Sequence, residues 1–178
     1  MDTTTAGHAA WAHLPKRVTL KDGSPVTLRV LVPEDADRLV ALFADISYSD
    51  LRELRDNVLD ERVVRRWCRY INYDRVLPVV AEVDGRLVAD ATLHRKATPA
   101  AADVGRFRAY VHPTYRHRGL ATMLLEEIKV IARNLRLKTL AVECFNDQEG
   151  LIRHLEALGF VRQAFIPAYQ TVVLVYTL

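Results

Sequence analysis

The hydrophobic pattern of the chain changes period at residues 112–119. Before this point, Val104–Val111 has the composition of a strand, and His112-Pro113 ends it because proline cannot donate a hydrogen bond to a sheet. After it, apolar residues recur at spacings of three and four, which predicts an amphipathic helix; they are Leu124, Ile128, Ile131 and Leu135. A strand therefore passes through one short loop into a helix, and the fold must accommodate that unit.

Strand-like runs and helical stretches alternate along the rest of the chain. The dipeptides Asp22-Gly23 and Asp84-Gly85 favour tight turns and predict two β-hairpins. The other expected strands and helices follow from periodicity; the strands are 17–20, 26–31, 77–83, 86–94, 104–111, 139–145, 160–166 and 171–178, and helices are expected within 33–46, 50–69, 124–135 and 146–158. This order predicts an α+β fold with a mixed sheet.

Length and composition indicate one compact domain. The 178 residues are 50% hydrophobic and 26% charged, which suits a single core. Residues 1–16 lack helical or strand periodicity, so we expect a flexible leader followed by a single domain over 17–178. The leader does not resemble a secretory signal and no apolar run reaches the length of a membrane span, so a cytoplasmic protein without membrane partners is expected.

Two cysteines, Cys68 and Cys144, lack the spacing of metal ligands or of a redox pair. Free buried thiols are the simpler interpretation, and no metal is expected. The net charge of +3 suits an anionic ligand but is too small to indicate nucleic acid by itself.

The loop before the predicted helix has the features of an anion site. The first N–H groups of a helix lack partners within it and carry the positive end of the helix dipole. Gly119 has no side chain where a phosphate would approach the backbone, and Arg116 and Arg118 carry donors suited to phosphate oxygens. A diphosphate is the natural ligand of such a loop. A solvated turn remains the alternative, since one glycine beside two arginines is common.

Two motifs resemble signatures of the GNAT superfamily of N-acetyltransferases. Arg116-x-x-Gly119-x-Ala121 is similar to the Q/R-x-x-G-x-G/A motif, whose main-chain amides hold the pyrophosphate of acyl-CoA in that family. Leu155–Phe160 is similar to a second signature, a helix that ends in Gly-Phe. Segments 20–30, 33–36 and 81–85 further resemble acetyltransferase domains related to bacterial protein-lysine acetyltransferases. The resemblance covers most of residues 17–178.

The resemblance implies the GNAT-like acyl-CoA N-acyltransferase fold, with a central, mixed, mostly antiparallel, seven-stranded sheet flanked by helices. It also implies acetyl-CoA as co-substrate and direct attack of a neutral amine on the thioester. The family seats the pantetheine arm in a gap between two strands, here 104–111 and 139–145. The residues thereby implied for CoA binding are Tyr110, Val111, Arg116, His117, Arg118, Gly119, Leu120, Ala121 and Thr122.

The chain departs from the family at two positions where relatives usually have a side chain that transfers a proton. Arg106 stands where many relatives have a glutamate that relays a proton from the amine, and arginine stays protonated in proteins. Leu155 stands where many relatives have a tyrosine that protonates the leaving thiolate. Asp90 and His94 alternate on one face of their strand and are the candidate replacements as base. The alternative is that both are surface groups without a catalytic role.

Arg106 and Arg108 share the strand face on which relatives carry that glutamate. As substrate-binding residues, two cations would favour an acceptor with an acidic group, or a lysine flanked by acidic residues. The alternative is that both arginines form structural ion pairs with Asp90, Asp103 or Glu143.

Three functions remain open from the sequence. The leading one is an enzyme that transfers an acetyl group to a primary amine, carried by a protein lysine or a small molecule. The two missing proton carriers motivate the second, an acyl-CoA-binding sensor or regulatory module without turnover. The arginine-rich stretch 50–69 motivates the third, a nucleic-acid-binding domain, but no recognisable motif supports it and nucleic acid is not expected. A homodimer is left open.

Overall fold

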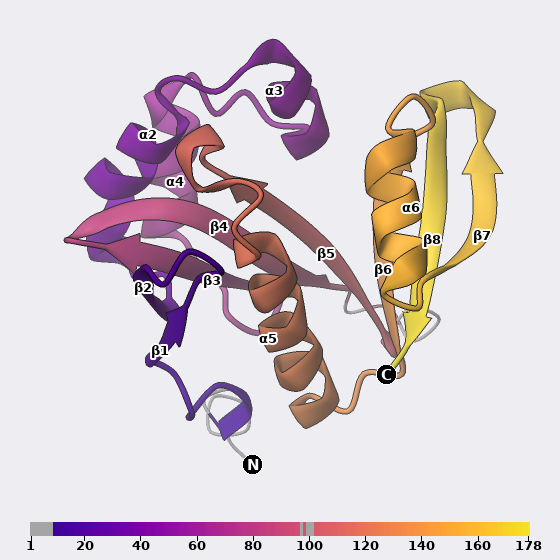
Figure 1. Ribbon diagram of the computed structural model, residues 1–178, viewed down its shortest axis with the longest axis horizontal. Helices are drawn as coiled ribbons and strands as arrows, with labels where there is room; N and C mark the ends of the chain where they lie inside the picture. Colours follow the sequence, from indigo (N-terminus) through magenta and orange to yellow (C-terminus); the bar gives the residue numbers. More distant parts are fainter. Residues whose placement is uncertain (1–8, 97, 99–101) are drawn as a thin grey trace.

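The computed structural model describes residues 9–96, 98 and 102–178 of the chain. The strands of these residues form one sheet in the order β1-β2-β3-β4-β5-β6-β8-β7 (Figure 1). Neighbouring strands are antiparallel except β5 and β6, which are parallel. The strands are β1 (Lys16–Thr19), β2 (Pro25–Val30), β3 (Val76–Val83), β4 (Arg86–Arg95), β5 (Val104–Val111), β6 (Thr139–Phe145), β7 (Val161–Ile166) and β8 (Thr171–Thr177).

The mixed, mostly antiparallel sheet and the α+β class are confirmed, but the sheet has eight strands rather than seven. The eight strands correspond to the eight runs expected from periodicity, and they include β1, which pairs with β2 at each of its four residues. The expected turn at Asp22-Gly23 makes this pairing possible, because Gly23 adopts a φ of 86° and closes a tight hairpin. The hairpin thus forms the edge of the sheet with the strand that was expected over residues 17–20.

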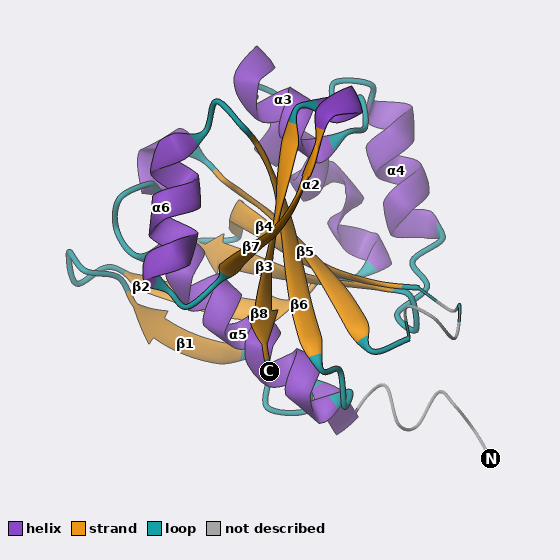
Figure 2. Cartoon of the chain, turned by 90° about the vertical axis from the view of Figure 1, so that its right-hand side faces the viewer, coloured by secondary structure: helices purple, strands orange, loops and turns teal. Residues whose placement is uncertain are grey.

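Helices cover both faces of the sheet. Figure 2 shows α2, α3 and α4 grouped together, with α5 at a distance from them. The α-helices are α2 (Ala36–Phe43), α3 (Tyr48–Leu54), α4 (Glu61–Arg69), α5 (Leu120–Asn134) and α6 (Glu149–Ala157), and short 3-10 turns are η1 (Pro33–Asp35), η3 (Pro113–Tyr115) and η4 (Pro167–Tyr169). None of the helices formed by the described residues combines the length and the hydrophobicity that a membrane span requires.

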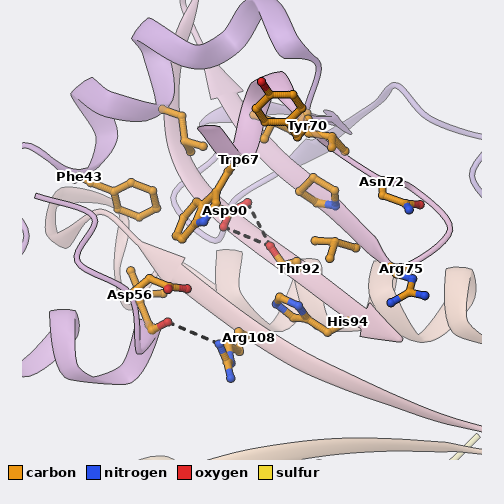
Figure 3. Close-up of a pocket in the computed structure, with 16 residues that line it drawn as sticks. Phe43, Asp56, Trp67, Tyr70, Asn72, Arg75, Asp90, Thr92, His94 and Arg108 are labelled. Carbon is orange, nitrogen blue, oxygen red and sulfur yellow. Dashed lines mark hydrogen bonds between the residues drawn. The ribbon is translucent and has the colours of Figure 1, made fainter. Parts of the chain in front are cut away.

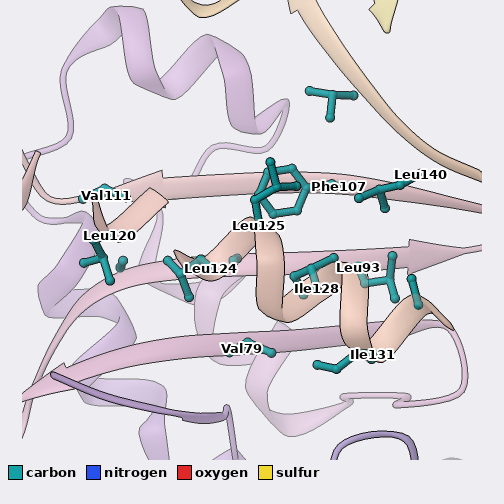
Figure 4. Close-up of a cluster of buried hydrophobic side chains, with 14 of the residues drawn as sticks. Val79, Leu93, Phe107, Val111, Leu120, Leu124, Leu125, Ile128, Ile131 and Leu140 are labelled. Atoms are coloured by element: carbon teal, nitrogen blue, oxygen red, sulfur yellow. The ribbon is translucent and has the colours of Figure 1, made fainter. Parts of the chain in front are cut away.

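The main core lies between α5 and the sheet (Figure 4). Leu124, Ile128 and Ile131, three residues of the predicted apolar stripe, are fully buried there with Leu93 of β4 and Leu140 of β6. Burial of side chains of this size contributes about 1.5–3 kcal/mol each. This helix therefore fixes the position of the loop that precedes it.

A second hydrophobic cluster lies on the opposite face, under α2 and α4. Phe43 packs there against Tyr110 of β5, with the ring centres 5.5 Å apart. The cluster also contains Cys68, while Cys144 lies in the main core. Both thiols are free and buried, as the sequence predicted.

The expectation of a flexible leader over residues 1–16 is wrong for its second half, residues 9–16. Residues 1–8 lie outside the described part of the chain, but Ala10 and Trp11 are buried in the main core. Two basic side chains of this segment contact Glu127, a buried carboxylate of α5; they are His13 and Lys16. The segment lacks periodicity because its burial depends on contacts with a helix more than 100 residues later.

Strands β5 and β6 pair at only three positions, from Val104 with Thr139 to Arg106 with Ala141. Beyond them β5 stays paired with β4 as far as Val111, and β6 stays paired with β8 as far as Phe145. The two strands consequently diverge, as Figure 1 shows. This is the divergence that the family resemblance implied between these strands.

Candidate functional site

The turn from β5 into α5 leaves the start of the helix uncapped. Gly119 is the N-cap residue and adopts a left-handed conformation with a φ of 87°, which glycine tolerates best. No side chain caps the helix, so the first N–H groups of this 15-residue helix remain available at its positive end. Leu120 is buried and holds the first turn in the main core. The predicted strand, loop and helix are all present.

Both loop arginines already have protein partners. Arg116 donates from Nε to the carbonyl of Val111 and from Nη2 to Asp50, each at 2.9 Å. Arg118 forms an ion pair with Asp22, with Nη1 and Oδ2 3.1 Å apart. The arginines that the sequence suggested as phosphate donors therefore also anchor the loop to α3 and to the β1–β2 turn.

Polar contacts hold α3 between the two diverging halves of the sheet. On the β5 side, Asp50 binds Arg116 of the loop. On the β6 side, three residues at the end of α3 contact β6 and the turn that follows it; the pairs are Arg52 with Asp147, Glu53 with Gln148, and Arg55 with Glu143. Helix α3 thus bridges the region where β5 and β6 have separated.

The register of β5 decides which backbone groups face the divergence. The N–H of His112 donates to the carbonyl of Val88 at 2.9 Å, so the polar groups of Val111 point away from β4 and toward β6. By the same alternation, Ala109 also faces β6, whereas the backbone groups of Tyr110 face β4. Of the two residues implied for the pantetheine arm, only Val111 has its backbone turned toward that side.

Arg106 and Arg108 have different surroundings. Arg106 forms an ion pair with Glu143 at 2.9 Å, and Arg55 contacts the other oxygen of the same carboxylate. This is the structural pairing that the sequence left open as an alternative. Arg108 instead donates to the carbonyl of Leu54 at 3.4 Å, and burial together with the charge of Arg55 lowers its pKa.

Asp90 and His94 lie on the wall of one cavity of about 290 Å³ (Figure 3). The cavity is on the face of the sheet that α2 and α4 cover, and Arg108 also lines it. Much of its wall is apolar and aromatic, including Leu39, Phe43 and Trp67. The structure therefore brings together both candidate bases and one of the two candidate substrate-binding arginines.

Asp90 is a carboxylate without a cationic partner. The hydroxyl of Thr92 donates to it at 3.3 Å, and no basic side chain of the described residues lies within ion-pair distance. Burial raises the pKa of Asp90 to about 7, and the hydrogen bond from Thr92 only partly opposes this shift. Such a group changes charge near neutral pH.

His94 shifts in the opposite direction. Burial, followed by the charge of Arg108, lowers the pKa of its imidazole to about 4. The ring is therefore neutral at neutral pH and too weakly basic to keep a proton from an amine. Of the two candidate bases, Asp90 has the pKa suited to that task.

Comparison with known proteins identifies the family. The sequence profile described as the Acetyltransferase (GNAT) family matches residues 43–160, well over half of the chain. The chain belongs to this family. The matched segment of this GNAT protein runs from the end of α2 to the Gly-Phe pair after α6, and it includes both motifs that suggested the resemblance.

Solved structures share the fold of this GNAT protein. The GNAT domain of S. lividans PAT superposes with a TM-score of 0.82 and 24% identity over 94% of this chain and 98% of that one. Ribosomal-protein-alanine N-acetyltransferase from Brucella melitensis gives 0.71 and 19% over 85% and 99%. The yncA protein from Salmonella typhimurium, solved with its cofactor acetyl-CoA, gives 0.70 and 17% over 85% and 93%. The expected GNAT fold is confirmed.

Sequence reasoning missed several residues of this GNAT site. Asp50, the partner of Arg116, gave no signal because 66 positions separate the two residues. Lys21 lies against Gly119 from a hairpin near the other end of the chain. The cavity wall formed by Leu39, Phe43 and Trp67 could not be predicted, because it depends on how α2 and α4 pack on the sheet.

The shared carboxylate of Glu143 leads to a stability prediction. We expect Glu143→Gln to lower the free energy of unfolding by about 1–3 kcal/mol, because Arg55 and Arg106 both lose a charged acceptor. Denaturant titration measures this change. Asp147→Asn is the matched control, since its pair with Arg52 is more exposed, and we expect a loss below about 1 kcal/mol. Equal losses in the two variants would contradict a structural role for the Arg106 pair.

Proposed function

We propose that this GNAT protein transfers an acetyl group from acetyl-CoA to a primary amine. The observation that carries the proposal is the uncapped N-terminus of α5 at Gly119, next to the diverging strands β5 and β6. Membership of the family supports the reaction class. The cofactor-binding and acceptor-binding residues below belong to the proposal.

The loop and first turn of α5 would bind the diphosphate of CoA. Backbone N–H groups of residues 119–122 are suited to phosphate oxygens, because no side chain caps them. Arg116, His117 and Arg118 add positive or polar groups to the loop, although both arginines share their charge with acidic partners. The N–H of Val111 would pair with the pantetheine arm, since its carbonyl already accepts from Arg116.

The proposed reaction needs no covalent intermediate on the enzyme. The neutral amine nitrogen attacks the thioester carbonyl, so a C–N bond forms and the C–S bond breaks. The thiolate leaves and takes a proton from solvent, while the proton of the amine passes to a base. The protein contributes mainly by holding the two reactants together.

Asp90 is the base that the geometry supports. It occupies the same sheet face as Arg106, which replaces the usual glutamate, and its register partner on β5 is Tyr110. An unpaired carboxylate on a cavity wall also attracts an ammonium group. The presence of Asp90 as a proton acceptor thus favours the enzyme hypothesis over the hypothesis of an acyl-CoA-binding module without turnover.

The cavity favours a small primary amine with an apolar or aromatic body. Leu39, Phe43 and Trp67 supply apolar wall to this cavity of about 290 Å³. Arg108 lines the same wall, so an acceptor with an acidic group still fits the proposal. One arginine would bind that group, rather than the two expected from the sequence. A protein lysine is the competing acceptor.

A panel of acceptors tests the reaction. We expect thiol release from acetyl-CoA with small apolar primary amines, and little release without an acceptor. Lysine peptides in the same assay decide between the acceptor classes. The absence of acceptor-dependent thiol release across the panel, with CoA still bound in calorimetry, would replace the enzyme by the binding-module alternative.

Substitution of Gly119 tests the CoA loop. We expect Gly119→Glu to abolish CoA binding in calorimetry, because the new carboxylate repels the diphosphate and the residue keeps a positive φ. Gly85→Glu is the control, since Gly85 also has a positive φ, at 77°, in the turn between β3 and β4. Unchanged affinity in a folded Gly119→Glu protein would remove the assignment.

The pH dependence tests Asp90. We expect kcat/KM to rise with pH through about 7 as the carboxylate loses its proton, and Asp90→Asn to lose this transition with a fall of about 10²-fold or more. His94→Gln should keep the transition. A second readout is stability: because the folded pKa is raised, the wild type should lose stability as pH rises from about 4 to about 7, and Asp90→Asn should not. A transition near pH 7 that survives in Asp90→Asn would assign the base elsewhere.

A further inference from the structure

The β1–β2 turn docks directly onto the loop before α5. The N–H of Lys21 donates to the carbonyl of Arg118 at 3.0 Å, and Asp22 forms the ion pair with the Arg118 side chain. These two contacts join segments almost 100 residues apart. They fix the turn beside the N-cap residue of the helix.

The side chain of Lys21 lies over Gly119. A Cβ atom placed on Gly119 would be 3.4 Å from both Cγ and Cε of Lys21, so the aliphatic stem passes in contact with this position. The missing side chain of Gly119 thereby leaves room for the aliphatic stem of the lysine. The ammonium group, one bond beyond Cε, is consequently held near the start of α5.

Lys21 differs from the two arginines of the loop because it has no acidic partner among the described residues. Arg116 is paired with Asp50 and Arg118 with Asp22. Among the described residues, no carboxylate lies within ion-pair distance of the Lys21 ammonium. Of the described basic side chains Arg116, Arg118 and Lys21, the one without an acidic partner is therefore Lys21 of the β1–β2 hairpin. Its ammonium is available to bind an anion.

The backbone of Lys21 is also held in place before any ligand binds. Leu20, its neighbour, is buried in the main core, and its N–H donates to Ser24 across the turn at 2.9 Å. Gly23 donates back to the carbonyl of Leu20 at 2.9 Å. A rigid backbone limits the entropy that the lysine loses when its ammonium contacts an anion.

We infer that Lys21 is a further CoA-binding residue, whose ammonium contacts the diphosphate bound at the start of α5. The inference rests on the proposed function, since it assumes that the loop binds CoA. An ammonium group offers three donors and a full charge, whereas the uncapped helix start offers backbone donors and a partial charge. Together they enclose the diphosphate between the β1–β2 turn and the helix.

Calorimetry with three ligands tests the role of Lys21. We expect Lys21→Met to weaken binding of CoA and of 3′-dephospho-CoA by the same factor, about tenfold, as for one charge-assisted hydrogen bond. Pantetheine, which lacks the diphosphate, should bind wild type and variant equally. Lys21→Arg should keep most of the affinity. The control is Lys138→Met, which removes the same charge from an exposed lysine paired with Asp103 and should leave the affinity for CoA unchanged.

The outcomes separate this inference from the proposed function. If wild-type protein fails to bind CoA, the proposed function fails. If wild type binds CoA and Lys21→Met binds it equally well, only the role of Lys21 is overturned. A loss restricted to CoA, with 3′-dephospho-CoA unaffected, would place the lysine on the 3′-phosphate and contradict the diphosphate contact. A matching loss for pantetheine would indicate a purely structural effect.

Discussion

The organisation of the site depends on the separation of β5 from β6 within one continuous sheet. β5 pairs with β4 from Gly105 to Val111 and β6 pairs with β8 from Thr139 to Phe145, whereas β5 and β6 pair with each other at only three positions. Because the backbone of Val111 is turned away from β4, its N–H and C=O lie on the side where the sheet has opened, and Arg116 donates to this carbonyl. The apolar contacts of α5 then set the helix start at the end of the same strand, and helix α3 bridges the two halves from the other face.

Carboxylates near this opening fall into two groups, according to whether or not they have a cationic partner. Asp50 and Glu143 each accept from arginine side chains and contribute to the positions of the elements around them. Asp90 has only a threonine hydroxyl, in a cavity with a largely apolar wall. A paired carboxylate has its charge compensated within the fold, whereas an unpaired buried one remains available for a cationic ligand. This difference is the basis for proposing Asp90, and neither Asp50 nor Glu143, as the base.

The same reasoning separates the two candidate bases. Burial acts on Asp90 and His94 in opposite directions, because it disfavours the charged form of each. The carboxylate reaches a pKa of about 7, while the imidazole falls to about 4. A group with a pKa near the working pH is the better proton acceptor. The loss of glutamate at position 106 is therefore compatible with general-base chemistry carried out from the neighbouring strand.

The sequence by itself determined the local elements and their order. Period two and period three-and-four patterns specified the strands and α5, and the glycine at position 119 could be recognised because a strand led into it and a helix out of it. Tertiary structure alone decided which side chains meet. The partners of Arg106, Arg116 and Arg118, the burial of Trp11, and the position of Lys21 over Gly119 all join segments distant in sequence. Local patterns report backbone periodicity and the apolar face of an element, whereas the pairing of charges and the shape of a cavity depend on how those faces pack together.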